Sequence, residues 1–168
     1  RRGSQIAQIA CCDIDSPSDF FNVYIDLSDQ DALGLTTDQS TLDFWAAQDQ
    51  AIRDKVWGGA LDLETALICF QIWLTDITAK EPFEVWMNSP SFDSEKILAP
   101  AFDLIDLALP WQFHQERDFR TLQNISKTYC NFPYQKPSGA HDALVDAQAQ
   151  GAFIYEAINR IKFFCSQK

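Results

Sequence analysis

Two short stretches carry residues that could bind a metal ion in one site. Asp93 lies in "NSPSFD", directly after the apolar run "EVWM" and before a helical pattern. The carboxyl edge of a sheet, where a strand hands over to a helix, is a common place for site residues in α/β proteins. His141 and Asp146 lie in "HDALVD", between a Pro/Gly loop and the last predicted helix. This spacing lets Asp146 hold a metal while His141 reaches the same site from the loop.

Each of these stretches also has a structural interpretation. Asp93 could simply cap the helix that follows it. His141 and Asp146 could be a surface histidine and a solvated carboxylate. Neither stretch alone establishes a site, and only their order and context together favour one.

A third acidic stretch, "LDLET" at residues 61–65, competes for the same role. On a strand, Asp62 and Glu64 would point the same way and could grip a cation between them. In a helix, two positions apart means about 200° of rotation, so they would point in nearly opposite directions. A helical apolar stripe follows the double glycine 58–59 and predicts a helix: Leu63, Leu67, Phe70, Leu74 and Ile77. We therefore predict that "LDLET" is not part of the metal site.

The elements before this helix are predicted to be a hairpin and one helix. "QIAQIACCDI" is a mostly apolar run typical of a buried strand, and "FFNVYIDL" alternates apolar and polar residues. The turn residues "DSPSD" between them indicate an antiparallel hairpin. Residues 40–56 follow with helical spacing, and Ser40 with Asp43 resembles a capping box.

The second half is predicted to alternate between strands and helices. The patterns predict a strand at 83–88, a helix over 94–109 that Pro100 should kink or split, a strand turning into a helix over 117–129, a loop at 131–139 and a helix over about 142–164. Strands followed by alternating helices and strands describe a layered α/β domain. We expect residues 1–168 to form one domain.

Composition narrows the class of protein. The net charge is −11, which argues against an ordinary basic nucleic-acid binder but not against an enzyme that reaches phosphates through cations. The five cysteines are odd in number and lack C-x-x-C spacing, which predicts a reducing, cytoplasmic setting. No apolar run approaches the length of a membrane span, and no secretory signal is visible.

Taken together, three stretches make the chain resemble a known family. "VWMNSPSFDSEKI", "PWQFHQERDFRTL" and "HDALVDAQAQ" are similar to the DEDDh 3′–5′ exonucleases of the RNase H-like superfamily. The similarity is greatest to the branch of phage exodeoxyribonuclease A and mycobacterial ribonuclease AS. The resemblance covers almost the whole chain and implies an RNase H-like mixed sheet flanked by helices.

The resemblance also implies roles for particular residues. Asp93 and Asp146 would bind metal, and His141 would act as general base. Two Mg²⁺ or Mn²⁺ ions would assist hydrolysis at the 3′ end of single-stranded DNA or RNA. Four further residues match positions that shape the site or the substrate groove: Asn88, Arg117, Asp118 and Arg120. Arg117 or Arg120 could instead simply pair with a carboxylate. Phe92 or Trp111 could stack on the terminal base of the substrate or could belong to the core. The family's first D-x-E motif is missing from this chain and is expected just upstream of Arg1.

Three functional interpretations stay open at this stage. The first is an exonuclease that takes its first motif from outside residues 1–168. The second is a catalytically inactive protein of the same fold with a binding or regulatory role. The third is an acidic interaction module without nuclease ancestry. The sequence does not determine DNA against RNA or the oligomeric state, and a homodimer is compatible with it.

Overall fold

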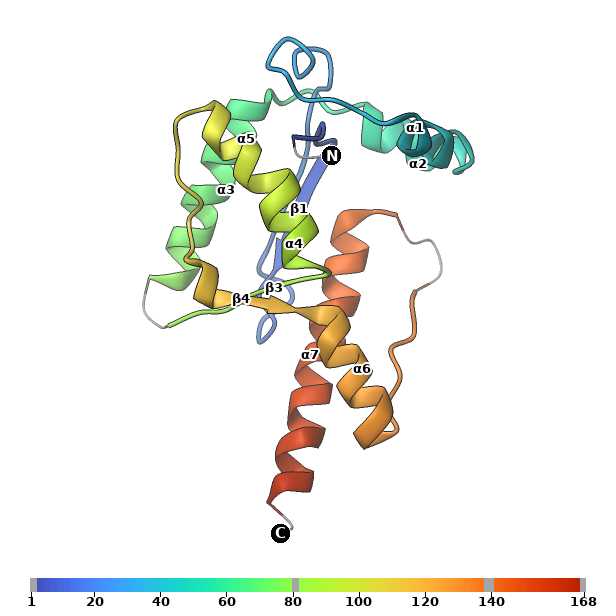
Figure 1. Cartoon of the computed structure of the whole chain (residues 1–168), viewed down its shortest axis with the longest axis vertical. Coiled ribbons are helices and arrows are strands. Elements are labelled where there is room, and N and C mark those ends of the chain that lie inside the picture. Colours follow the sequence, from blue (N-terminus) through green and yellow to red (C-terminus); the bar gives the residue numbers. More distant parts are fainter. Residues whose placement is uncertain (1–2, 80–81, 138–140, 167–168) are drawn as a thin grey trace.

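The computed structural model describes residues 3–79, 82–137 and 141–166. Helices predominate, and the strands are short (Figure 1). The elements are, in chain order, β1 (Gln8–Cys12), β2 (Phe20–Tyr24), α1 (Gln39–Ala46), α2 (Gln50–Trp57), α3 (Leu63–Thr78), β3 (Val85–Met87), α4 (Pro90–Phe92), the π-helical turn η1 (Asp93–Leu98), α5 (Ala99–Leu104), the 3₁₀ turn η2 (Phe113–Gln115), β4 (Glu116–Asp118), α6 (Phe119–Cys130) and α7 (Ala143–Cys165).

The predicted hairpin is confirmed. β1 and β2 pair antiparallel in a register that sets Ala10 opposite Asn22. Phe21 and Ile25 are buried, as the alternation of the second strand predicts. β1 is shorter than the apolar run because the chain turns at Asp13, whose carboxylate accepts a bond from the backbone N–H of Asp15 at 2.8 Å.

The other two strands form a separate pair. β3 and β4 are parallel, with Trp86 opposite Arg117. The four named strands of the described residues therefore make two two-stranded sheets rather than one mixed sheet. The α/β class is confirmed in this coarse sense, whereas the RNase H-like arrangement is not established by these strands.

The helix predicted over residues 40–56 is two helices. The break lies between Ala46 and Gln50, and Asp49 is the N-cap of α2. The capping-box prediction is wrong because α1 already begins at Gln39, which places Ser40 inside the helix and not at its cap. α1 and α2 form an arm set apart from α3 and α5 (Figure 1).

The helical interpretation of "LDLET" is confirmed. Asp62 is the N-cap of α3, and its carboxylate accepts bonds from the backbone N–H and the hydroxyl of Thr65, both at 2.8 Å. Glu64 is exposed in the first turn. The glycine before this helix is required by a close approach, because a Cβ at Gly59 would lie 2.4 Å from the backbone nitrogen of Ile25.

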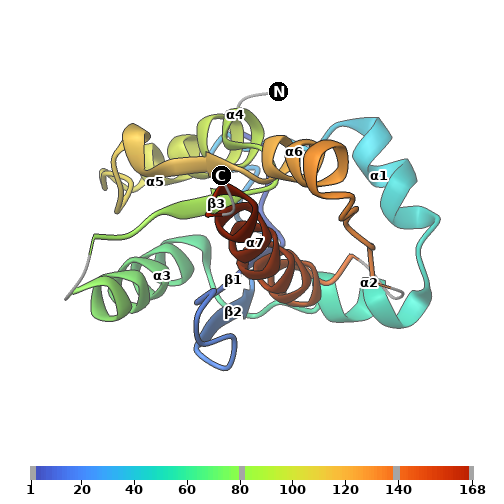
Figure 2. The ribbon, with the colours of Figure 1, turned by 90° about the horizontal axis from the view of Figure 1, so that it is seen from below.

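Buried side chains gather in two clusters. The larger joins the hairpin, α3 and α5 and includes Ile25, Leu67 and Phe102. The smaller lies between α6 and α7 and includes Phe119 and Phe153. α7 packs along β1 and beside α6, so it belongs to both halves of the structure (Figure 2). None of the described helices is both long and apolar enough to cross a membrane.

The segment after β3 is helical, but not uniformly so. Pro100 falls in the first turn of α5, where a missing N–H costs little, and the six residues before α5 wind as a π-helix. The prediction that Pro100 splits this helix is wrong, because the backbone is helical on both sides of it and only the winding changes, from π to α. The helix ends at Leu104 rather than at residue 109. π-helical turns recur at functional sites, and this one begins at Asp93.

Candidate functional site

Asp93 lies at the junction of α4 and η1. Its Oδ2 accepts a hydrogen bond from the backbone N–H of Ser89 at 2.8 Å. Burial raises the pKa of this carboxyl above its usual value, and the Ser89 N–H and the positive charge of Arg120 oppose that shift only in part. The carboxylate is thus half-buried, close to a guanidinium, and fixed by its own backbone turn.

Asp146 lies in the first turn of α7. Its Oδ1 is buried and accepts no hydrogen bond. Burial, and secondarily the negative charge of Asp146, raise the pKa of the Tyr134 hydroxyl, so the tyrosine lies beside this carboxylate. Since buried polar atoms are normally paired, an unpaired carboxylate oxygen is suited to receive a cation or a ligand donor.

A hollow of about 500 Å³ connects Asp146 with residues near the other motif. It opens where α6 and α7 approach the end of β3. Nine residues line it: Asn88, Phe119, Arg120, Gln123, Asn124, Tyr134, Lys136, Asp146 and Gln150. The lining thus holds two cationic side chains, four amides and one carboxylate. Three of the residues singled out from the sequence, Asn88, Arg120 and Asp146, line this hollow.

His141 and Asp93 are not part of that lining. The imidazole of His141 packs edge-on against the ring of Phe44 in α1, with 4.9 Å between ring centroids. Its backbone φ is 109°, in the left-handed region that favours glycine. Asp93 is linked to the hollow through the charge of Arg120. The expected grouping of Asp93, Asp146 and His141 around one metal stays a prediction.

The other predicted substrate residues differ in their surroundings. Phe92 is 51% exposed beside Asp93 and free to meet a ligand. Arg117 instead donates to Glu84 Oε1 from Nε and Nη2, at 3.0 and 2.7 Å, and to two backbone carbonyls. These contacts support the structural interpretation of Arg117. Trp111, a second candidate for stacking on a base, is buried and donates its indole N–H to Glu116 at 2.9 Å.

The acidic residues fit a hard cation in type but not in number. Within residues 3–79, 82–137 and 141–166, no three His, Cys, Asp or Glu side chains come together in a group able to hold a metal. Mg²⁺ commonly binds through one or two carboxylates and completes its shell with water and substrate phosphates. Asp93 and the unpaired oxygen of Asp146 fit that kind of site.

Several residues of the hollow were not predicted from the sequence. Tyr134 and Lys136 come from the loop before α7, where spacing gives no periodic signal. Gln150 lies one helical turn after Asp146, and Gln123 and Asn124 lie one turn after Arg120. Helical neighbours at i+3 and i+4 share a face, so the two motif residues could have indicated these amides.

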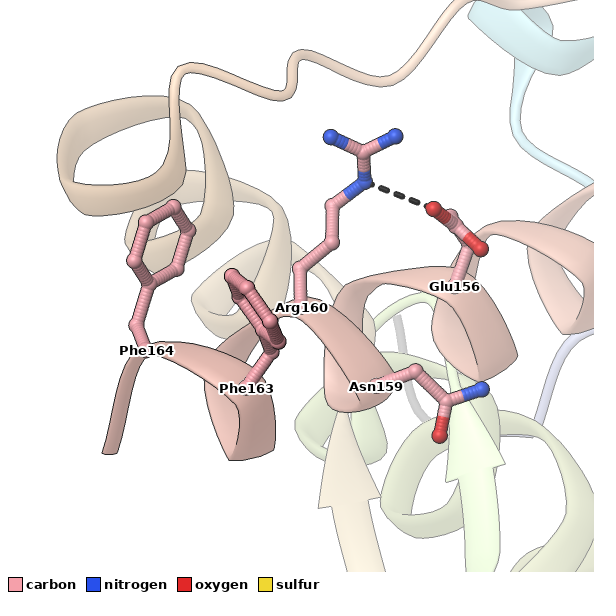
Figure 3. Close-up of a pocket in the computed structure, with 5 residues that line it drawn as sticks. All are labelled: Glu156, Asn159, Arg160, Phe163 and Phe164. Carbon is pink, nitrogen blue, oxygen red and sulfur yellow. Dashed lines mark hydrogen bonds and ion pairs between the residues drawn. The ribbon is translucent and has the colours of Figure 1, made fainter. Parts of the chain in front are cut away.

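A second hollow, of about 310 Å³, lies at the far end of α7. Figure 3 shows its lining, in which Arg160 donates to Glu156 at 2.7 Å beside Phe163 and Phe164. All its lining residues come from one helix face, and fourteen residues at 1.5 Å rise separate Asp146 from Arg160 by about 21 Å. This hollow is not part of the candidate site.

Comparison with known proteins gives one family. The family described as "3′-5′ exoribonuclease Rv2179c-like domain" matches residues 1–158. No curated protein and no solved structure matches the chain.

Proposed function

The chain belongs to the family of 3′–5′ exoribonuclease Rv2179c-like domains, and on that premise we propose that it removes nucleotides from the 3′ end of RNA by metal-assisted hydrolysis. The observation that carries the proposal is the hollow that unites Asn88, Arg120 and Asp146. It combines an unpaired buried carboxylate oxygen with two cations in a chain whose net charge is −11. Such a combination suits a phosphodiester held between metal and protein. Single-stranded DNA, which could undergo the same hydrolysis, is the second substrate of the test.

The side chains of the hollow divide by chemistry. Asp93 and Asp146 would hold the cations through carboxylate oxygens, as hard cations require. Bound Mg²⁺ or Mn²⁺ would polarise the scissile phosphate and make water a better nucleophile. Arg120 and Lys136 would bind phosphate oxygens of the RNA backbone. The amides of the lining can donate to and accept from base edges and ribose hydroxyls.

His141 is proposed as the general base. A neutral imidazole can accept a proton from the attacking water. It stands one position before the N-cap of α7, while Asp146 stands in the first turn of that helix. His141 therefore lies just before the helix that carries Asp146. Proton transfer to His141 and departure of the 3′-oxygen would release a nucleoside 5′-monophosphate.

Further metal ligands are needed for a two-ion site. The described residues offer no group of three candidate ligands. We propose that a D-x-E strand outside residues 1–168 supplies the missing carboxylates, and that without it metal binding is weak because affinity depends on the number of charged oxygens.

The test uses RNA and DNA oligonucleotides labelled at the 5′ end, with the 168-residue chain and with a protein extended upstream through D-x-E. The extended protein should shorten RNA from the 3′ end with Mn²⁺ or Mg²⁺ and stop with EDTA. Asp146→Asn should abolish cleavage, whereas Asp76→Asn, at an exposed position of α3, should not. Binding of RNA without cleavage by the extended protein would instead identify an inactive member of the family.

A further inference from the structure

Asp142, the N-cap of α7, is bonded to four parts of the chain. Its Oδ1 accepts bonds from Gln8 Nε2 at 3.1 Å and from the backbone N–H of Leu144 at 3.0 Å. Its Oδ2 accepts a bond from the Tyr24 hydroxyl at 2.9 Å and forms an ion pair with Lys55 Nζ. The partners come from β1, β2, α2 and α7 itself. We call Gln8, Tyr24, Lys55 and Asp142 the Asp142 clasp.

The clasp fixes the start of α7 to the hairpin in more than one direction. Gln8 also contacts the next residue, because its Oε1 accepts a bond from the backbone N–H of Ala143 at 2.9 Å. Its Nε2 also donates to Asn22 Oδ1 at 2.8 Å, which orients the amide. Two of the first backbone N–H groups of α7 are thereby satisfied, and both bonds define where the helix begins.

The charges of the clasp reinforce its geometry. Burial alone would raise the pKa of Asp142, but bonds from Lys55, Gln8 and Tyr24 outweigh it and hold the pKa well below its usual range. The bond to Asp142 also raises the pKa of Lys55. The Asp142 side chain is only 13% exposed, while that of Lys55 is 57% exposed. Both groups are thus ionised at neutral pH, and the carboxylate is shielded from water.

His141, the neighbour of Asp142, has a backbone conformation that needs such support. A φ of 109° is unfavourable for a residue with a Cβ. It persists only where surrounding bonds determine it. The clasp fixes the next residue, and the ring of Phe44 contacts the imidazole from α1.

We infer that Asp142 is a positioning residue for His141, holding the junction that aims the imidazole. This inference rests on the proposed role of His141 as general base. The carboxylate does not itself meet substrate. It acts through its bonds to Gln8 and Tyr24, which hold the start of α7 to the hairpin, and through the ion pair with Lys55, which joins it to α2.

The first experiment measures position without activity. The protein has only two histidines, so the imidazole signals of His141 are separable by NMR from those of exposed His114. Wild type should show a nuclear Overhauser effect between the rings of His141 and Phe44. Asp142→Asn should reduce it at least about two-fold, because the charge that pairs with Lys55 is gone.

Two other variants make the result specific. Lys55→Gln changes an exposed side chain 87 positions from Asp142 and leaves the cap of α7 intact. It should weaken the His141–Phe44 nuclear Overhauser effect in a protein that folds normally. Asp62→Asn makes the identical change at the N-cap of α3 and should leave it unchanged. Unaltered His141–Phe44 contact in folded Asp142→Asn and Lys55→Gln would overturn the inference.

A kinetic double-mutant cycle then tests the coupling between Asp142 and His141 in the protein extended upstream through D-x-E. Asp142→Asn should lower kcat roughly 10- to 100-fold with KM nearly unchanged, the range for a displaced catalytic group. In a His141→Ala background the same change should cost less than about two-fold, since residues that act as a unit are not additive. If the effects of the two substitutions on kcat instead multiply in the double variant, Asp142 acts independently of His141 and the inference is wrong. Absence of cleavage in every protein would refute the proposed function while the NMR result still decides the positioning.

Discussion

Asp146→Ala should make the metal-free protein more stable. The substitution removes a carboxylate whose Oδ1 is buried without a hydrogen-bond partner. Most substitutions of buried residues destabilise, so the expected direction is unusual. It follows because the buried Oδ1 makes no hydrogen bond that would offset the loss of its contact with water.

The magnitude follows from three opposing contributions. An unsatisfied buried polar group costs about 1–3 kcal/mol, which the variant recovers. Asp146 also lies in the first turn of α7, where a negative charge contributes about 0.3–1 kcal/mol that the variant loses. Alanine adds about 0.5 kcal/mol of helix propensity. The net gain is about 0.5–3 kcal/mol, which for a chain of this length raises Tm by about 1–12 °C.

The assay is thermal unfolding followed by circular dichroism, first in EDTA and then with Mn²⁺. At ten times its Kd, Mn²⁺ should stabilise wild type by about 1.4 kcal/mol, and it should not stabilise Asp146→Ala. The Tm of each protein with Mn²⁺ is compared with its own Tm in EDTA, so the difference in helix propensity between Asp and Ala does not affect this comparison. The difference between the two melting temperatures, with the variant higher in EDTA, should therefore shrink or change sign as Mn²⁺ is added.

Asp118→Ala is the matched control. Asp118 is also a helix-terminal carboxylate, but it accepts a bond from the Thr121 backbone N–H at 2.6 Å. Its loss should destabilise by about 1 kcal/mol, the usual cost of removing a cap. If Asp146→Ala also loses stability in EDTA, or gains as much from Mn²⁺ as wild type does, the reasoning about Oδ1 is wrong.

Four further predictions address the site and its supports. Lys136→Met should raise KM for RNA several-fold and reduce the slope of log affinity against log salt by about 0.7, the value for one single-strand phosphate contact; an unchanged slope would remove Lys136 from the substrate groove. His141→Ala should slow turnover of the full-length protein by roughly 10²–10⁴-fold while Mn²⁺ still raises Tm, and a loss of that metal response would make His141 a ligand. The double variant Asp62→Ala, Glu64→Ala should keep the wild-type Mn²⁺ response, since "LDLET" only starts α3; a smaller response would place it in the site. Because the pKa of Asp142 is lowered by folding, its contribution is complete above its usual value of about 4 and is lost as pH falls through the folded value, so the stability gap between wild type and Asp142→Asn, about 1.5 kcal/mol at pH 7, should close in acid.

The parts of the fold that were predictable are those with an unbroken local pattern. The stripe that includes Leu67 and Leu74 identified α3, and the alternation around Phe21 identified the hairpin. Both patterns follow from one face being buried. The break between α1 and α2 was not predictable, because α1 has no buried residue to register its end. The pairing of strands into two separate sheets is a long-range property that no local pattern carries.

The residues of the hollow that the motifs singled out are Asn88, Arg120 and Asp146. That they act in one site stays a prediction. Tyr134 and Lys136 reach the hollow from an irregular loop, whose path depends on tertiary contacts. Asp142 stood inside the quoted motif, but its importance comes from partners up to 134 positions away in the sequence.

The π-helical turn that starts at Asp93 has a consequence for insertions and deletions. A π turn accommodates roughly one residue more than an α turn, and each α-helical residue corresponds to about 100° of rotation. Removing one residue between Asp93 and Leu98 would let the segment relax to an α-helix, so α5 would keep its rotation and the fully buried Ala101 and Phe102 would stay in the core. Removing two residues would leave the segment one residue short and would turn α5 by about 100°, which would carry both side chains out of the core. The surplus residue should therefore let this segment absorb a one-residue deletion that an ordinary α-helix could not.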